Sequence, residues 1–214
     1  MAGVGAVVVA AGRGDRFGTP KQFVELDGER LVDRAVRACR AVSDEVVVVL
    51  PSGVGWDGPP VDAAVDGGAT RSGSVRAGLA ALRGDHDVVV VHDAARPLAS
   101  RALFDAVIAA VRAGADAAVP GVPVADTLKR VDGTRVVETV DRDALVAVQT
   151  PQAFRTTVLR AAHGSVGDAT DDAALVEAAG GTVTVVRGEA DNFKVTEPAD
   201  LRRARVVLGE ARAQ

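Results

Sequence analysis

A glycine-rich loop over residues 12–21 carries the positive charges best suited to binding an anion. An apolar run, Val4 to Ala11, ends abruptly at this loop, which contains three glycines and the cations Arg13, Arg16 and Lys21. Glycine allows backbone N–H groups to approach an anion closely, while arginine and lysine supply full positive charges. The pattern predicts a buried strand that ends in a phosphate-binding loop, and the ligand it implies is polyanionic.

Two well-known phosphate loops do not fit this stretch. A Walker A loop requires Gly-Lys-Ser/Thr, but here Lys21 follows Pro20. A dinucleotide fingerprint requires glycine or alanine three residues beyond Gly14, where Phe17 stands, and the second apolar run ends in Leu50-Pro51-Ser52 without a ribose-binding acid. An ordinary strand-to-helix turn remains an alternative for this loop taken alone.

Lysine is scarce in this chain, which marks the few positions that keep it. The sequence has 22 arginines but only three lysines, Lys21, Lys129 and Lys194. A compact ammonium group differs chemically from a planar guanidinium, so lysine positions are candidates for sites where that difference matters. Lys21 and Lys194 are the stronger candidates, because Lys129 lies in an expected hairpin with exposed neighbours.

Three further clusters combine charge with glycine or turn residues. In His92-Asp93-Ala94-Ala95-Arg96, Asp93 could hold Mg²⁺ or a ribose hydroxyl, and the alternative is an Asp93–Arg96 pair that staples the turn; His92 is expected to pack. The turn at residues 67–74 could contact the edge of a base. Arg142 and Lys194 suit a second anionic group, although a solvated surface pair is the alternative for Arg142.

Composition excludes several classes of function. The chain has 214 residues, 48% of them hydrophobic, with a net charge of −4 and 3% aromatics, so we expect one compact domain over residues 1–214 and no nucleic-acid partner. Cys39 is the only cysteine, and His163 has no histidine neighbours for zinc. The sequence shows no Ser/His/Asp or Cys/His arrangement for covalent catalysis. The catalytic strategies that remain are positioning of the substrates and electrostatic stabilisation, which are the minimum that phosphoryl-type transfer requires.

The first apolar run is too short to span a bilayer and lacks a basic leader, so we expect a cytoplasmic protein with no membrane partner.

Apolar β-type runs alternate with helical patterns along the chain. This alternation predicts a three-layer α/β fold with a largely parallel sheet. The expected strands are residues 4–11, 46–50, 88–91, 115–119 and 182–186, and the expected helices are residues 31–42, 72–83, 101–112, 156–163, 171–179 and 198 to the C-terminus.

In such sheets ligands bind beyond the carboxyl ends of the strands, so polar clusters at those ends should form one site. These clusters are residues 12–21, 66–68 with Arg71, 92–96, 149–150 and 192–194.

Residues 122–145 depart from this alternation. Two strand-like arms, Thr127 to Val131 and Thr134 to Val140, flank Asp132-Gly133, which indicates a hairpin with a type I′ turn. An isolated two-stranded hairpin is marginally stable in water, so we expect it to project and dock on a second subunit in a C2 dimer. A hairpin folded back on its own domain is the alternative.

Taken together, the motifs resemble a known family. They are AAGRGDRF…PKQF (residues 10–23), VDGGATRSGSV (65–75), VHDAARP (91–97), PVADTLKR (123–130), TVDRDAL (139–145), QTPQAF (149–154), ATDDA (169–173) and DNFKVT (191–196). In this order they resemble the 2-C-methyl-D-erythritol 4-phosphate cytidylyltransferase family, the CTP-using enzymes of the non-mevalonate isoprenoid pathway. The resemblance runs from the first strand to the last helix.

The resemblance implies a Rossmann-like nucleotidyltransferase fold and a Mg²⁺-dependent transfer from CTP to a polyol phosphate, with release of pyrophosphate. Arg16 and Lys21 match the pair that stabilises the transition state. The residues that match positions for the attacking substrate are Arg142, Lys194, Thr127, Thr150 and Thr170. The nucleotide-binding set is Ala10, Ala11, Gly12, Gly14, Gly68, Arg71, Ser74, Asp93, Ala94 and Arg96, with Asp93 also the candidate metal ligand. The resemblance also implies a homodimer in which Thr127 completes the partner's site.

The sequence leaves the base contacts and three alternative functions open. Ala69 and Ser72 depart from the pattern of relatives, which leaves the cytosine contacts undefined. Ribitol 5-phosphate cytidylyltransferases look similar in the same motifs. A glycosyltransferase-like module is a third interpretation. Asp141-Arg142-Asp143 has the Asp-x-Asp spacing of the metal motif of such modules, but it lies beside the hairpin and away from the end of a strand. A non-catalytic dimer that senses nucleotide is the fourth interpretation.

Overall fold

A computed structural model describes residues 3–12, 14, 17–165 and 167–213 of the chain. Its main sheet has eight strands in the order β10-β7-β11-β6-β1-β4-β5, with β12 also paired to β7. The strands are β1 (Gly3–Val9), β4 (Glu45–Leu50), β5 (Ala63–Asp66), β6 (His86–Asp93), β7 (Ala117–Pro123), β10 (Val146–Val148), β11 (Gln152–Arg155) and β12 (Val183–Arg187). The predicted, largely parallel sheet is confirmed.

Strand β1 lies at the centre of the sheet and runs parallel to both of its neighbours, β4 and β6. The pairs β4–β5 and β7–β12 are also parallel, whereas β10 and β11 run antiparallel to the strands beside them. The carboxyl ends of the parallel strands therefore share one edge of the sheet, and the loop after β1 begins at the middle of that edge.

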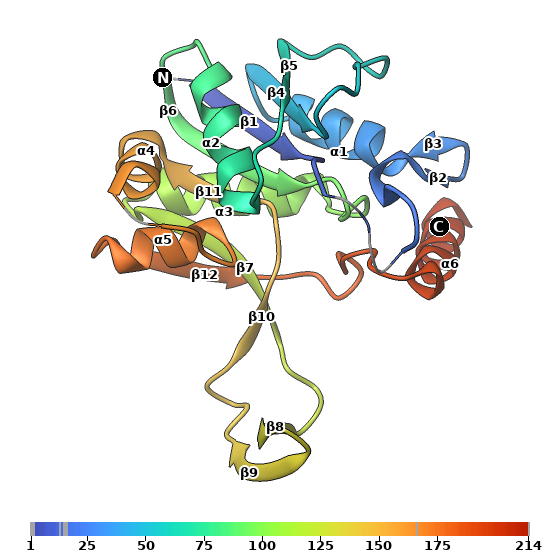
Figure 1. Ribbon diagram of the computed structural model, residues 1–214, viewed down its shortest axis with the longest axis vertical. Helices are drawn as coiled ribbons and strands as arrows, with labels where there is room; N and C mark the ends of the chain where they lie inside the picture. Colours follow the sequence, from blue (N-terminus) through green and yellow to red (C-terminus); the bar gives the residue numbers. More distant parts are fainter. Residues whose placement is uncertain (1–2, 13, 15–16, 166, 214) are drawn as a thin grey trace.

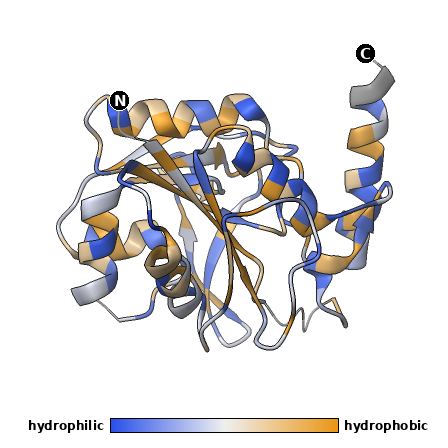
Figure 2. Cartoon of the chain, turned by 90° about the horizontal axis from the view of Figure 1, so that it is seen from above, coloured by the Kyte–Doolittle hydropathy of each residue, from blue (hydrophilic) through white to orange (hydrophobic). Residues whose placement is uncertain are grey.

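Helices cover both faces of the sheet, which gives the predicted three layers (Figure 1). One face carries α1 (Leu31–Arg40) and α3 (Arg101–Arg112), and the other carries α2 (Arg71–Ala81), α4 (Thr156–Ser165) and α5 (Asp172–Ala178). Figure 2 shows hydrophobic residues concentrated on the strands and mixed character on the helices around them. The unbroken apolar runs of the central strands follow from this burial on both sides.

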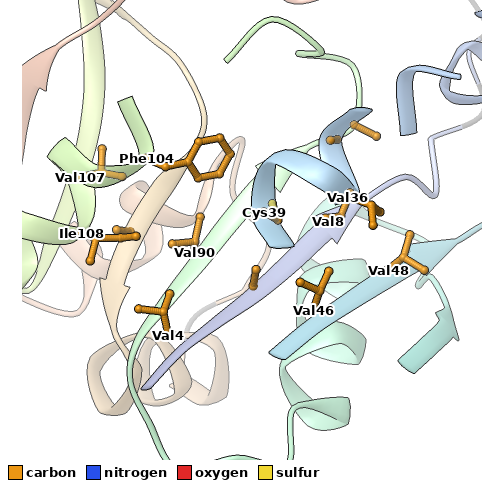
Figure 3. Close-up of a cluster of buried hydrophobic side chains, with 14 of the residues drawn as sticks. Val4, Val8, Val36, Cys39, Val46, Val48, Val90, Phe104, Val107 and Ile108 are labelled. Carbon is orange, nitrogen blue, oxygen red and sulfur yellow. The ribbon is translucent and has the colours of Figure 1, made fainter. Parts of the chain in front are cut away.

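Alternate residues of each central strand pack on opposite faces, as the pleat requires. Val8, Val46 and Val90 meet the apolar sides of α1 and α3, including Phe104 (Figure 3). Val7 points the other way, into the cluster beneath α2 and α4. Cys39 is fully buried in the first cluster, as a core residue should be.

The C-terminal helix, α6 (Pro198–Ala213), packs beside the sheet and not on it (Figure 1). Its residues Leu201 and Ala204 join Leu26, Leu31 and Val195 in a third apolar cluster. Leu26 belongs to a short hairpin of β2 (Glu25–Leu26) and β3 (Glu29–Arg30), which follows the 3-10 turn η1 (Lys21–Phe23). This cluster therefore brings the segment after β12 next to the loop after β1. No helix in the described ranges is long and apolar enough to cross a membrane.

The hairpin predicted near residues 122–145 is present as β8 (Leu128–Asp132) and β9 (Arg135–Val140), and it extends away from the rest of the chain (Figure 1). Its expected turn is wrong in detail. Asp132 pairs with Arg135, so the two loop residues are Gly133 and Thr134, and only Gly133 has a positive φ. A type I′ turn needs positive φ at both central residues, so the register is shifted by one residue from the prediction.

Close packing of α2 on β1 yields a test of the fold. A Cβ added at Gly78 would lie 2.4 Å from Val7 Cγ1 and 3.0 Å from Val49 Cγ2. Alanine favours a helix over glycine by about 1 kcal/mol, but overpacking a core costs about 1–3 kcal/mol. We therefore expect Gly78→Ala to lower the free energy of unfolding by up to about 2 kcal/mol in urea denaturation.

Gly209 in α6 provides the matched control, because a Cβ there would meet nothing within 4 Å. Gly209→Ala should raise the free energy of unfolding by about 1 kcal/mol. Equal stabilisation by both substitutions would contradict the close approach of α2 to β1.

Candidate active site

A cavity of about 570 Å³ opens at the shared carboxyl edge of β1, β5 and β6. The described residues bring eleven of the predicted site residues together in its wall: Ala10, Ala11, Gly12, Gly14, Lys21, Gly68, Arg71, Ser74, Asp93, Ala94 and Lys194. Eight of them belong to four of the five polar clusters, which lie after β1, β5, β6 and β12, and Ala10, Ala11 and Ser74 lie next to these clusters in the sequence. The geometric expectation that these clusters converge is therefore met.

A smaller cavity of about 140 Å³ adjoins the first. The two share Arg71, Asp93 and Lys194 in their walls. The smaller one is also lined by predicted residues Arg96, Thr150 and Thr170. Arg96 thus lies with the residues predicted for the attacking substrate, and not in the wall of the larger cavity. Two adjoining cavities with a shared charged wall can hold two ligands side by side.

Asp93 is the electrostatic centre of this shared wall. Its Oδ2 accepts a hydrogen bond from Lys194 Nζ at 2.7 Å, and its Oδ1 lies 3.3 Å from Arg71 Nη2. Burial alone would raise the Asp93 pKa, but Arg71 and Lys194 outweigh it and hold that pKa well below its usual range. Burial likewise opposes the charge of Arg71, yet Asp93 and Asp172 raise the Arg71 pKa. Asp93 and Arg71 therefore both stay charged at neutral pH.

A hydrogen-bonded chain behind Asp93 fixes Thr150. The backbone N–H of Asp93 donates to Thr150 Oγ1 at 3.0 Å, and the same hydroxyl lies 3.2 Å from His92 Nδ1. His92 Nε2 is 3.2 Å from the Arg96 carbonyl oxygen, and its ring packs 5.1 Å from that of Phe104. Burial lowers the pKa of His92 to about 4, so the ring is neutral near pH 7. His92 therefore packs, as expected, and also orients a predicted site residue.

The glycine-rich loop is held by its own backbone and by a buried amide. Phe17 N–H and Gly18 N–H both donate to the Gly14 carbonyl oxygen, at 2.8 and 3.0 Å. Gln22 is almost fully buried, and its Nε2 donates to the Gly12 carbonyl oxygen at 3.0 Å. These bonds bring Lys21, in η1, to the cavity wall. The other predicted transition-state cation, Arg16, lies outside the described residues.

The turn after β5 closes the opposite side of the larger cavity. Thr70 is the N-cap of α2, and its side chain accepts a hydrogen bond from Gly73 N–H at 3.0 Å. Ser74 Oγ donates to the Thr70 carbonyl oxygen at 3.0 Å. Gly68 lies so close to this turn that an added Cβ would be 2.7 Å from the Gly73 carbonyl carbon. The turn is therefore closely packed and internally hydrogen-bonded where it lines the cavity.

Two predicted residues lie far from both cavities in this chain. Thr127 and Arg142 sit on the projecting segment between β7 and β10, and both are exposed. Arg142 Nη1 donates to the carbonyl oxygen of Ala125. Neither residue lines either of these two cavities.

Three residues that shape the site were given no individual role by the sequence, although Gln149 and Asn192 belong to polar clusters that were expected to meet there. Gln149 Nε2 donates to the Glu189 carbonyl oxygen at 2.7 Å, and Asn192 Nδ2 donates to the Thr150 carbonyl oxygen at 2.9 Å. Asp172, fully buried, lies 2.7 Å from Arg71 Nη1. Each is a polar side chain next to apolar sequence, and that position is the signal that could have indicated burial with a partner.

The carboxylates available for a metal ion are few. No group of three or more His, Cys, Asp or Glu side chains that could hold a metal occurs among the residues the structure describes. Asp93 is the only acidic residue in the described wall of the larger cavity. Mg²⁺ is usually bound by one or two carboxylates together with substrate phosphates, so Asp93 fits a site that a phosphate ligand completes.

The sequence of this chain is similar to those of known proteins over nearly its whole length. Residues 4–210 match the family model described as IspD: 2-C-methyl-D-erythritol 4-phosphate cytidylyltransferase. A 2-C-methyl-D-erythritol 4-phosphate cytidylyltransferase of Streptomyces coelicolor is 47% identical, with 97% of this chain and 85% of that protein covered. A bifunctional enzyme IspD/IspF of Clavibacter michiganensis is 50% identical over 94% of this chain. The chain spans about half the length of that bifunctional relative, 53% of it.

A solved structure extends the similarity to three dimensions. The crystal structure of 2-C-methyl-D-erythritol 4-phosphate cytidylyltransferase from Thermus thermophilus superimposes with a TM-score of 0.82 at 39% identity. The match covers 95% of this chain and 98% of that one. The similarity therefore includes the elements that carry both cavities.

The glycine-rich loop provides a test of anion binding. Gly14 has a φ of +73°, and an added Cβ would lie 2.1 Å from the Thr19 carbonyl oxygen and 3.2 Å from Lys21 N. We expect Gly14→Ala to displace the turn that positions Lys21 and to weaken binding of inorganic tripolyphosphate about 10-fold or more, the equivalent of about 1.4 kcal/mol, in calorimetric titration.

Gly18→Ala is the control, since Gly18 also has a positive φ, +82°, but an added Cβ meets nothing within 4 Å. An alanine at this positive φ should lower the free energy of unfolding by about 1–2 kcal/mol, with no steric clash. The tripolyphosphate affinity of this variant should therefore change less than that of the Gly14 variant. Equal losses in the two variants would show that the Gly14 contact does not shape an anion site.

Proposed function

We propose that this chain, which belongs to the 2-C-methyl-D-erythritol 4-phosphate cytidylyltransferase family, transfers the cytidylyl group of CTP to 2-C-methyl-D-erythritol 4-phosphate. The products are 4-diphosphocytidyl-2-C-methyl-D-erythritol and pyrophosphate. The reaction serves the synthesis of isoprenoid precursors by the non-mevalonate route.

One observation carries the proposal: the charge balance of the larger cavity. Its described wall contains three cations, Lys21, Arg71 and Lys194, against one carboxylate, Asp93. Glycine backbone supplies further N–H groups beside Lys21. A site with this excess of positive charge and a glycine-rich wall suits a triphosphate.

The chemical step is a displacement at phosphorus. A phosphate oxygen of methylerythritol phosphate forms a bond to the α-phosphorus of CTP. The bond between that phosphorus and the oxygen bridging to the β-phosphate breaks, and pyrophosphate leaves with the electron pair. Negative charge grows on the equatorial oxygens of the α-phosphate, where Lys21 and Arg16 are proposed to stabilise it.

The two cavities suggest where each substrate binds. We assign CTP to the larger one, with its phosphates on the loop from Gly12 to Lys21 and its base on the turn from Gly68 to Ser74. The smaller one, with Thr150, Thr170 and Arg96, suits the polyol phosphate, and Lys194 faces both. The phosphate nucleophile would then approach across the shared wall.

Mg²⁺ is the proposed cofactor, and Asp93 is the residue that would hold it. When bound with CTP, the ion would neutralise part of the triphosphate charge. Asp93 now bonds Lys194 at 2.7 Å, so holding the cation would loosen that pair. Lys194 would then be available to the phosphate of the second substrate.

The projecting segment supports a homodimer. We propose that residues 1–214 form one cytidylyltransferase domain and that the arm at residues 122–145 docks on a second copy. Exposed apolar side chains gather on the arm and at its base, where burial by a partner would be favourable. They are Val131, Val136, Val137, Leu145, Val146, Val148 and Val185. Thr127 and Arg142, which reach neither cavity of their own chain, would then contribute to the partner's smaller cavity.

The function is tested by pyrophosphate release. The purified chain with CTP, Mg²⁺ and methylerythritol phosphate should release pyrophosphate, and ATP, GTP and UTP should serve poorly. Lys21→Ala and Arg16→Ala should each lower kcat by about 10²- to 10³-fold, the loss seen when one preorganised donor at a developing charge is removed. Because Lys129 lies on the arm and bonds Thr139, Lys129→Ala is the matched lysine control and should change kcat less than about 3-fold.

Two results would revise the proposal differently. A higher kcat/KM with ribitol 5-phosphate would keep the chemistry and replace the alcohol. CTP binding without any pyrophosphate release would favour a nucleotide sensor over an enzyme. We place the enzyme in the cytoplasm, where its proposed nucleotide substrate is made.

The exchange of arms predicts complementation between two inactive variants. Lys21→Ala damages the body of the site, while Arg142→Ala damages the arm. If arms cross, a mixed dimer contains one intact site, so an equal mixture refolded together should recover up to about a quarter of wild-type activity at twice the mass of the 214-residue chain. Recovery no greater than the sum of the separate variants, or a monomeric mass, would contradict the crossed arm.

A further inference from the structure

Asp172 lies behind the site and lines neither cavity. It is the first residue of α5 and is fully buried. Its Oδ2 accepts a hydrogen bond from Arg71 Nη1 at 2.7 Å, and its Oδ1 lies 2.9 Å from His163 Nε2. Both carboxylate oxygens are thus engaged by groups from other helices, α2 and α4.

The contacts of Arg71 are unequal, and the difference is informative. The guanidinium bonds Asp172 at 2.7 Å but stands 3.3 and 3.4 Å from Asp93 Oδ1. Asp93 in turn has its short bond, 2.7 Å, with Lys194. Asp172 therefore fixes the orientation of Arg71, while the edge of Arg71 that faces Asp93 is held loosely.

The orientation of Arg71 matters because its guanidinium is planar. Arg71 lines both cavities, as Lys194 does, and its side chain is 23% exposed, so its guanidinium lies in the wall that the two cavities share. A planar guanidinium recognises phosphate through a fixed fork of N–H groups, and a rotation would misalign that fork. The short bond of Arg71 is to Asp172, which lines neither cavity.

Building on the proposed function, we propose that Asp172 is a positioning residue that acts through Arg71. It holds the guanidinium at the junction of the two cavities, oriented toward phosphate oxygens of the bound substrates. His163 occupies the second oxygen of Asp172 and keeps the carboxylate from rotating. Arg71 contacts the substrates; Asp172 does not.

Neighbouring acids do not share this arrangement. Asp171 is the N-cap of α5, and its Oδ1 accepts from Ala174 N–H while its Oδ2 accepts from Gln152 Nε2. Asp168 also joins α2 to the loop before α5, since its Oδ1 accepts from Thr70 Oγ1 at 2.9 Å and Arg76 Nη2 at 3.2 Å. The Asp168 side chain is about half exposed and does not contact Arg71. Asp168→Asn therefore tests docking of the loop alone.

A double-mutant cycle separates positioning from general support of the fold. The four proteins are wild type, Asp172→Asn, Arg71→Ala and the double variant, with kcat/KM measured for pyrophosphate release. We expect Asp172→Asn to lower kcat/KM about 10- to 100-fold in the wild-type background, as loss of an orienting partner does. In the Arg71→Ala background the same change should cost less than about 3-fold. Asp168→Asn should stay within about 3-fold of wild type.

An equal loss in both backgrounds would overturn the proposal, because Asp172 would then act without Arg71. No loss in the wild-type background would also overturn it. If Asp172→Asn does not fold, the comparison of Arg71→Ala with the double variant still decides, since the double variant leaves neither of these two charges buried alone. Thermal melting of each protein reports folding.

Measuring CTP binding tests the role of Asp172 separately from the proposed transfer reaction. The same four proteins are titrated with CTP alone, and the coupling between the two positions should appear as a loss of affinity that depends on Arg71. If wild type binds CTP without releasing pyrophosphate, the proposed function fails while this coupling is still measured. If CTP affinity shows no coupling, and turnover shows none either, Asp172 is structural only.

Discussion

A buried carboxylate among cations is the interaction on which the site depends. Asp93 lies at the end of β6 with Lys194 and Arg71 against its two oxygens. A charge taken out of water must be paired and hydrogen-bonded, or its burial would be too costly. That requirement draws together the segment after β12 and the start of α2, which are distant in the sequence. In the described wall of the larger cavity, Lys21, Arg71 and Lys194 outnumber the one carboxylate, Asp93, so the wall suits an anion.

The sheet makes this convergence possible. Because β1, β4, β5 and β6 are parallel, their carboxyl ends share an edge, and the polar loops that follow them meet there. Two apolar clusters on opposite faces hold the strands in register. The third cluster, beneath α6, holds the Lys194 segment beside η1. Stability and site geometry therefore arise from the same packing, since the strands that form the core also end at the cavity.

Much of this could be predicted from the sequence, and the misses have physical reasons. Continuous apolar runs predicted β1, β4 and β6, and strand ends predicted which polar residues meet. The short strands β5, β10 and β11 lack a clear period over three or four residues, and β11 is antiparallel within the sheet, which no local pattern reveals. The role of Asp172 has no local signal, because its partner Arg71 lies 101 residues away. The turn of the arm lies one residue later than predicted, since Asp132-Gly133 and Gly133-Thr134 both contain a glycine.

The central claim is that the paired charges at the sheet edge receive a triphosphate. A crystal structure of the chain with CTP and Mg²⁺ tests it most directly. We expect the triphosphate in the larger cavity against Gly12, Gly14 and Lys21, the cytosine at the turn from Gly68 to Ser74, and Lys194 moved away from Asp93 toward the smaller cavity. Nucleotide bound elsewhere on the chain, or a triphosphate that leaves Lys21 and Asp93 without contact to it or its metal, would contradict the account.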